Sequence, residues 1–296
     1  MFKLQVIFYK SFMWILDVAM KLIPLPKPTL FVGQGSALQF AQSITTMGSQ
    51  RLFIVTDKVI NELGMLEGIK QVCQEAGVEV EVYDGILPDP TFALIESGIS
   101  AARAHKCDAI LAVGGGSSID AAKMISVGLT NNKTLLQLTG MLKVSEPGIP
   151  LYVVPTTAGT GSEVTAAAVI TDPSSGQKMS VIDAKLVPFS AALDPTLMTG
   201  LPAPITAATG IDALTHAIEA YVSCAATEET DSHARAATKM ILSTCRRPTQ
   251  MAVTSSPVKR SHSPLAMQGW RLPKPGLVMF TPSLTNSAQN TMCHTA

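Results

Sequence analysis

The sequence has no excess charge of either sign, because 22 acidic residues balance 22 basic residues along 296 positions. A protein that binds nucleic acid or an anionic membrane by long-range attraction usually carries a surplus of lysine and arginine. The charge balance therefore favours a small neutral molecule as the partner, and we expect neither nucleic acid nor a membrane.

Paired cysteines are missing as well. The five cysteines are scattered along the chain and form no C-x-x-C pair. This spacing argues against a disulfide framework and against a structural zinc site. Scattered free thiols are typical of a reducing compartment, so we expect a cytoplasmic protein.

Long uncharged apolar runs are also absent. The N-terminal stretch MFKLQVIFYKSFMWILDVAMKLI is apolar, but Lys3, Lys10, Asp17 and Lys21 interrupt it. A membrane-spanning helix needs about 20 consecutive apolar residues, and a secretory signal needs a small-residue cleavage site after its apolar core. We therefore interpret residues 1–22 as an amphipathic lead-in helix rather than a membrane anchor.

What the sequence does have is an alternation of β-branched runs with helical stretches. Runs that read as strands cover 51–57, 109–118 and 151–163, another strand starts near 79, and helical stretches cover 61–77 and 91–106. Alternation of this kind is typical of β-α-β units on a parallel sheet, whose ligands bind beyond the carboxyl ends of the strands. We expect an α/β, Rossmann-like dinucleotide-binding domain in residues 23–198.

The pattern changes twice further along the chain. Strand-like runs give way to helical periodicity in residues 199–244, which we interpret as the start of an all-helical domain. Residues 245–296 show neither period and are rich in Ser, Thr and Pro, with basic but almost no acidic residues. Such a composition predicts a disordered tail, which would leave the helical domain incomplete.

One glycine-rich turn carries a candidate phosphate site. Gly114, Gly115, Gly116 and Ser117 stand directly between a predicted strand and a predicted helix. Glycine lets the backbone approach a pyrophosphate closely, and the free amides at the start of a helix attract its charge. A strand-to-helix turn of this kind can also be purely structural, since it is not the G-x-G-x-x-G pattern.

Further polar residues also follow strands. The turn PTTAGTGSE offers the hydroxyl groups of Thr156, Thr157 and Thr160 to the same ligand. Asp57 either accepts hydrogen bonds from a ribose 2′-hydroxyl, which favours NAD, or caps the following helix. Lys178 is either a solvated loop charge or a cation near the cofactor.

A carboxylate and an imidazole stand four residues apart in the stretch GIDALTHAIEAY. Positions i and i+4 share one helical face, so Asp212 and His216 can bind one metal ion. Mixed oxygen and nitrogen ligands suit Fe(II) or Zn(II). Two protein ligands rarely hold a catalytic metal alone, so others must come from elsewhere.

Five ordered motifs resemble the iron-containing (group III) alcohol dehydrogenases. They are FIVTD, GGGSSIDAAK, PTTAGTGSEVT, DPTLM…LP and ATGIDALTHAIEAY, and they run from about Lys27 to Thr244. The resemblance implies hydride transfer between a primary or secondary alcohol and NAD, a divalent metal (iron) between two domains, and a homodimer.

The same resemblance assigns the candidate residues. It places Asp57 at the adenosine ribose, Gly115 to Ser117 at the pyrophosphate, Thr156, Thr157, Thr160 and Lys178 along the rest of the dinucleotide, and Asp212 and His216 among four metal ligands.

The other two ligands of the family are histidines in a later H-x-x-x-H-x9-H-G segment, which this sequence does not contain. We propose that the tail is encoded in a shifted reading frame. In that frame, each codon consists of the last base of one present codon and the first two bases of the next. The codons of residues 279 and 280 can then encode only Val, and those of 280 and 281 can encode His. The codon pairs 284–285 and 294–295 can also encode His. Resequencing the gene around codon 244 would test this.

A chain that keeps two of four ligands is expected to bind NAD weakly and to have little dehydrogenase activity. The alternative function is a catalytically inactive nucleotide-binding module. A rival within the enzymes is a non-redox relative of the fold, such as a dehydroquinate synthase, although the PTTAGTGSE and DALTHAIEAY motifs favour the alcohol dehydrogenases.

Overall fold

The computed structural model describes residues 26–173, 175–223 and 226–245. The predicted lead-in helix (1–22) lies outside the described residues, and so does the predicted tail from residue 246 onward.

A six-stranded sheet forms the centre of the described part, in the order β1-β9-β6-β4-β2-β3, and all its neighbouring strands are parallel. The strands are β1 (Thr29–Val32), β2 (Arg51–Val55), β3 (Glu79–Tyr83), β4 (Ala109–Gly114), β6 (Leu151–Pro155) and β9 (Ser190–Leu193). The helices between them are α2 (Ser36–Thr46), α3 (Lys58–Glu62), α4 (Glu67–Glu75), α5 (Phe92–His105), α6 (Gly116–Thr130) and α7 (Leu135–Leu138). The predicted α/β fold class is confirmed.

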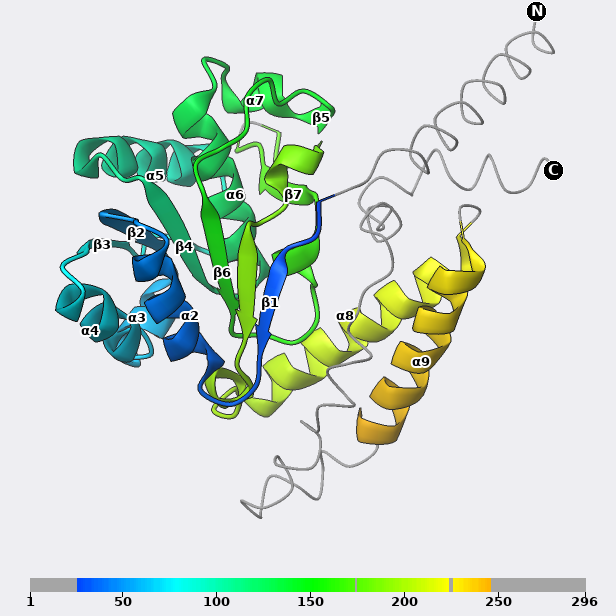
Figure 1. The fold of residues 1–296 in the computed structure, drawn as a ribbon. Coiled ribbons are helices and arrows are strands. Elements are labelled where there is room, and N and C mark those ends of the chain that lie inside the picture. Colours follow the sequence, from blue (N-terminus) through cyan, green and yellow to red (C-terminus); the bar gives the residue numbers. More distant parts are fainter. Residues whose placement is uncertain (1–25, 174, 224–225, 246–296) are drawn as a thin grey trace, which may run out of the picture.

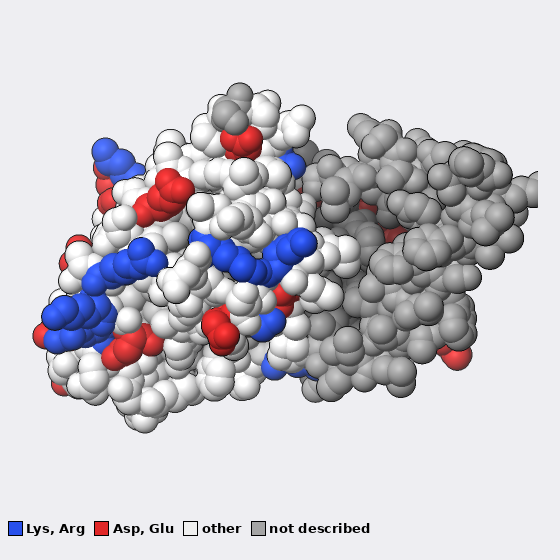
Figure 2. Space-filling model, turned by 90° about the horizontal axis from the view of Figure 1, so that it is seen from above, with Lys and Arg blue, Asp and Glu red and all other residues white. Residues whose placement is uncertain are grey.

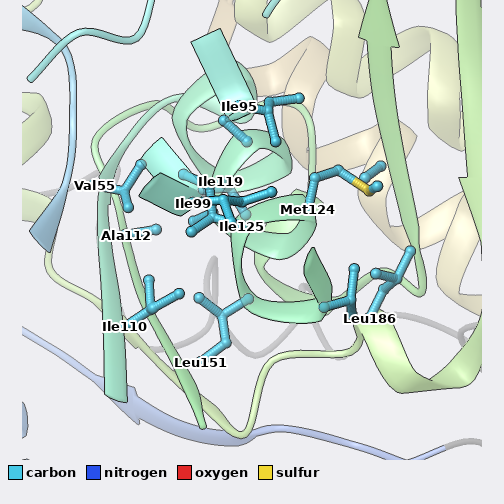
Figure 3. Close-up of a cluster of buried hydrophobic side chains, with 14 of the residues drawn as sticks. Val55, Ile95, Ile99, Ile110, Ala112, Ile119, Met124, Ile125, Leu151 and Leu186 are labelled. Atoms are coloured by element: carbon cyan, nitrogen blue, oxygen red, sulfur yellow. The ribbon is translucent and has the colours of Figure 1, made fainter. Parts of the chain in front are cut away.

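The central strands are buried on both faces. Every residue of β4 (AILAVG) and of β6 (LYVVP) is buried, as expected for parallel strands that carry helices on either side. On one face, Ile95 and Ile99 of α5 and Ile119 of α6 belong to one cluster of buried side chains with Ile110 of β4 (Figure 3). On the other face, residues of α2, α3 and α4 pack against alternate residues of the same strands. These two layers fix where the strand ends lie (Figure 1).

Two local features differ from the sequence-based expectation. The helix expected over 61–77 is two helices, α3 and α4, separated at Gly64, whose φ of 68° is readily adopted by glycine and ends the first helix. The sequence also gave no indication of a second, three-stranded sheet, β5-β8-β7. Its strands are β5 (Gly140–Met141), β7 (Ala167–Thr171) and β8 (Lys178–Ile182), with 3-10 turns η1 (Ser162–Val164) and η2 (Ala184–Leu186) beside them.

The chain leaves the main sheet through the 3-10 turn η3 (Pro195–Met198), whose first residues are capped by Asp194. Two helices follow, α8 (Ala203–Val222) and α9 (Glu228–Cys245), and they pack against each other. The predicted division at residue 198 falls at the end of η3, and it remains a prediction. None of the described helices combines the length and apolar character needed to cross a membrane.

The surface of the described part carries both signs of charge. On the face shown in Figure 2, acidic and basic side chains are interspersed. This distribution agrees with the equal numbers of acidic and basic residues in the sequence.

The buried centre of β4 should dominate the stability of the sheet. Leu111 is 1% exposed, whereas Leu136 on α7 is 55% exposed. We expect Leu111→Ala to lower the free energy of unfolding by about 2–5 kcal/mol, because it leaves a cavity in the core. Urea unfolding followed by far-UV circular dichroism measures this. Leu136→Ala is the control and should change the value by less than about 0.5 kcal/mol; equal effects would contradict the described burial.

Candidate functional site

The polar turns picked out from the sequence follow three neighbouring strands. Asp57 comes just after β2, the glycine turn ends β4, and the threonine turn follows β6. These strands pair in parallel, β2 with β4 and β4 with β6. Parallel pairing brings their carboxyl ends to one edge, so the three turns form one candidate site there.

The glycine turn presents a free helix terminus. Gly115 precedes the first residue of α6, and no described side chain caps the helix there. The first amides of a helix have no partner within the helix, and its dipole makes this end positive. Ser117 is partly exposed in the first turn of α6. The arrangement suits an anion such as a pyrophosphate.

The threonine loop lies directly against the glycine turn. A Cβ atom at Gly116 would lie 2.9 Å from Thr160 Cγ2, and one at Gly115 would lie 3.4 Å from the side chain of Thr157. The two turns therefore touch, and at Gly116 a side chain larger than hydrogen would not fit without displacing Thr160. The described structure brings Thr157 and Thr160 to the N-terminal end of α6, where the candidate phosphate site lies.

Thr156 has a different surrounding from the other two threonines. It is 2% exposed, and its backbone N–H donates to the Gly114 carbonyl over 2.9 Å. This bond continues the pairing of β6 with β4 by one residue. Thr156 therefore joins the two turns through its main chain, while its side chain is buried.

Asp57 performs the capping role that the sequence left open. Its Oδ1 accepts a hydrogen bond from the Ile60 N–H at 3.0 Å, which caps α3. Its Oδ2 lies 3.8 Å from the position of a Cβ at Gly114. One oxygen is thus used in the cap, and the other faces the glycine turn.

Lys178 is at the first position of β8, and its ammonium group lies 2.6 Å from Asp89 Oδ1. Both side chains are at least half exposed. An exposed ion pair of this kind contributes little to stability. The structure thus shows Lys178 in a surface ion pair, and its role at a cofactor remains a prediction.

The candidate metal pair lies on α8. Asp212 Oδ1 and His216 Nε2 are 3.6 Å apart, on one face of the helix as the spacing predicts. Glu219 lies one turn further along α8. Burial raises the pKa of its carboxyl group, His216 acts to lower this pKa, and the negative charge of Asp212 acts to raise it. Among the described residues, no three His, Cys, Asp or Glu side chains lie close enough together to hold a metal ion. The described part therefore supplies two donors suited to a divalent metal and no third.

The threonine loop also reaches the helix that carries this pair. A Cβ atom at Gly159 would lie 2.5 Å from the Thr209 carbonyl oxygen and 2.9 Å from Thr209 Cβ. Thr209 precedes Asp212 by less than one helical turn. The threonine loop is thus in close contact with the part of α8 that directly precedes the candidate metal pair.

One buried charge near the candidate site was not predicted from the sequence. Lys123 of α6 is completely buried, and burial lowers its pKa to about 8, against the opposing effects of Asp120 and Glu163. A lysine inside the otherwise apolar stretch AAKMISVG is the signal that points to burial.

Comparison with known proteins identifies the family to which the chain belongs. The profile of the Iron-containing alcohol dehydrogenase family matches residues 27–195, and the profile described as Fe-containing alcohol dehydrogenase family, C-terminal, matches residues 206–252. The chain belongs to the iron-containing alcohol dehydrogenases. The resemblance inferred from the five sequence motifs is confirmed.

Several members of the family are similar in sequence. The NAD-dependent methanol dehydrogenase of Bacillus methanolicus is 40% identical over 214 residues, which cover 72% of this chain and 56% of that protein. The 1,3-propanediol dehydrogenase of Klebsiella pneumoniae is 36% identical over 219 residues, which cover 73% of this chain and 57% of that protein. The chain thus spans little more than half the length of these relatives.

Solved structures of the family share the fold. A 1,3-propanediol oxidoreductase is 34% identical, with a TM-score of 0.75 over 82% of this chain and 63% of its own. An alcohol dehydrogenase from Oenococcus oeni is 31% identical, with a TM-score of 0.78 over 86% of this chain and 65% of its own. A sulfoacetaldehyde reductase from Bifidobacterium kashiwanohense, solved in complex with NAD+, is 26% identical, with a TM-score of 0.73 over 84% of this chain and 66% of its own.

The contact at Gly159 gives a prediction for stability. Gly159→Ala should lower the free energy of unfolding by about 1–3 kcal/mol, because the methyl group collides with main-chain atoms of α8 that cannot rotate away. Gly200 has no atom within 4 Å of a built Cβ, so Gly200→Ala is the matched control and should be neutral or slightly stabilising. Urea unfolding of both variants measures the difference. A Gly159→Ala variant as stable as the control would contradict the contact.

Proposed function

We propose that the chain supplies the dinucleotide-binding part and the first metal ligands of an oxidoreductase that transfers a hydride between a primary or secondary alcohol and NAD. The observation that carries the proposal is the contact of Gly115 and Gly116 with Thr157 and Thr160 at the carboxyl edge of the sheet. Two similar proteins, a methanol dehydrogenase named as NAD-dependent and a reductase solved with NAD+, support the choice of cofactor.

The proposed cofactor site follows the edge of the sheet. The pyrophosphate would bind at the first amides of α6, where Gly114, Gly115 and Gly116 leave room and Ser117 offers a hydroxyl. The free oxygen of Asp57 would accept a hydrogen bond from the adenosine ribose, which favours NAD over its phosphorylated form. Thr156, Thr157, Thr160 and Lys178 would line the remainder. A glycine turn at a helix start without a side-chain cap fits this ligand.

Asp212 and His216 would be two ligands of a divalent metal, for which we propose Fe(II), with Zn(II) as the second candidate. When bound, such a metal supplies Lewis-acid polarisation of an alcohol oxygen. The described residues provide a carboxylate and an imidazole at a suitable distance but no third donor. We therefore propose that the chain holds metal weakly and has little dehydrogenase activity, because two ligands leave the ion loosely bound.

The remaining attributes follow from the same proposal. The substrate would be a small alcohol or the corresponding aldehyde, with neither nucleic acid nor a membrane as a partner. The absence of a C-x-x-C pair and the scattered cysteines favour the cytoplasm. We propose a homodimer for the full-length member of the family.

The second candidate function is a catalytically inactive nucleotide-binding module, favoured by the lack of a third metal donor among the described residues. Titration with NADH by fluorescence, next to metal analysis after incubation with Fe(II), separates the two. Binding of NADH together with weak metal binding and slow, metal-dependent alcohol turnover supports the enzyme. Binding of NADH without metal supports the module, and a chain that binds no NADH overturns both.

The glycine turn gives a prediction for affinity. Gly116→Ala should weaken NADH binding on the order of tenfold, equivalent to about 1.4 kcal/mol, because the new methyl group displaces Thr160 from the pyrophosphate. Fluorescence titration of the purified variant measures this. Gly200→Ala adds the same methyl group at an open position and should bind NADH as the unchanged chain does. Equal affinity of the two variants would argue against this turn as the phosphate site.

Asp57 allows its two roles to be separated. Asp57→Ser keeps a side-chain oxygen for the cap of α3 but removes the negative charge, so the stability should change little. We expect the preference for NADH over NADPH to fall on the order of tenfold, because the repulsion of the ribose phosphate disappears. Asp57→Ala should show the same change in preference and also lose about 1 kcal/mol of stability. An unchanged preference in both variants would leave Asp57 with the cap alone.

A further inference from the structure

Three charged side chains, two of them buried and one largely buried, lie beside the candidate cofactor site without belonging to it. Asp120 and Lys123 lie on α6, and Glu163 lies on η1. The side chain of Lys123 is 0% exposed and that of Asp120 is 16% exposed, while Glu163 as a residue is 5% exposed. A buried charge is costly in free energy unless it is paired and hydrogen-bonded, so the stability of this cluster depends on the partners of its three charged groups.

Lys123 crosses from α6 to the segment that follows the threonine loop. Its Nζ, which has three N–H donors, lies within hydrogen-bond distance of four acceptors: Ser162 Oγ at 3.1 Å, the carbonyl and hydroxyl oxygens of Thr165 at 3.0 Å, and the Ala167 carbonyl at 2.7 Å. Asp120 Oδ1 lies 3.9 Å away. One ammonium group therefore gathers acceptors from a stretch of six residues, 162–167.

Asp120 reinforces the same connection one turn earlier in the helix. Its Oδ1 accepts a hydrogen bond from the Ser162 hydroxyl, and its Oδ2 accepts one from the Val169 N–H at 3.0 Å. At the start of the helix, Gly116 is in contact with Thr160. Successive turns of α6 are thus joined to successive parts of residues 160–169, from the candidate phosphate site to β7.

We propose that Lys123 is a positioning residue for the dinucleotide, whose ammonium group holds residues 160–167 against α6 and so keeps Thr157 and Thr160 beside the first amides of the helix. The inference rests on the proposed NAD site. Lys123 itself is buried below the surface, so it would not touch the cofactor. It acts through the loop, because Ser162 lies two residues from Thr160 and donates its backbone N–H to the Thr160 hydroxyl over 3.3 Å.

The charge state of Lys123 gives the proposal a signature. Its pKa is lowered to about 8 by burial, while Asp120 and Glu163, the two charged groups that face it, act in the opposite direction. Burial raises the pKa of both carboxyl groups. As pH rises through about 8, the ammonium group loses its proton and its charge-assisted hydrogen bonds to the loop weaken. The affinity for NADH should therefore be highest below this pH and fall above it.

The experiment is a fluorescence titration of the 296-residue chain with NADH at a series of pH values. For the unchanged chain, we expect the Kd for NADH to rise on the order of tenfold between about pH 7 and about pH 9.5. Lys123→Met should bind NADH more weakly at neutral pH and show no such rise. Asp120→Asn removes a negative neighbour of Lys123, so its rise should begin at lower pH. Lys70→Met, at a lysine paired with Glu67 on the opposite face of the sheet, should follow the unchanged chain.

A merely structural lysine would reduce stability without producing this pH profile. Binding of NADH by the unchanged chain with a constant Kd over the whole range would overturn the inference and leave the proposed function intact. A shift in Asp120→Asn toward higher pH would also overturn it. If Lys123→Met does not fold, the profiles of the unchanged chain and of Asp120→Asn decide the question.

Failure of the proposed function has a different outcome. If the unchanged chain binds no NADH at any pH, the proposed cofactor site and its positioning by Lys123 are both overturned. Amide hydrogen exchange then decides whether Lys123 holds the loop. Protection of residues 160–167 should fall in Lys123→Met while protection of β2 is retained. Equal protection of the loop in both chains would overturn this part too.

Discussion

The parallel pairing of β2, β4 and β6 is the constraint on which the rest of the site depends. Each strand is followed by a short polar turn, and parallel pairing places all three turns at one edge. The apolar layers on both faces of the sheet fix this pairing, because a strand that shifted by one residue would turn its buried side chains toward the wrong helix layer. The candidate cofactor site is therefore a consequence of the core.

Much of this arrangement could be predicted from the residues. The continuous apolar runs of β4 and β6 indicated buried parallel strands, and Gly114 to Gly116 marked the turn between β4 and α6. The spacing of Asp212 and His216 placed them on one helical face, as found. These features depend on residues near each other in the sequence, and local patterns carry that information.

What the sequence did not reveal depends on contacts between distant residues. Lys123 and Asp120 form hydrogen bonds with residues 162–169, which lie about forty positions further along the chain. No spacing of residues in the sequence indicates these hydrogen bonds. The small sheet consists of the short strands β5, β7 and β8, and their pairing also depends on packing that the local sequence pattern does not indicate. Gly64 divides a stretch with helical periodicity on both sides, because its backbone conformation outweighs the pattern.

The meeting of Gly159 with the carbonyl of Thr209 has a practical consequence for protein engineering. The distance between the loop and α8 is set there by main-chain atoms, so exchanging side chains at that point cannot adjust it. Moving the loop away from α8 would require a longer loop or a different path for it. Random mutagenesis that replaces single residues would sample such changes poorly, whereas libraries with insertions around residue 159 would reach them.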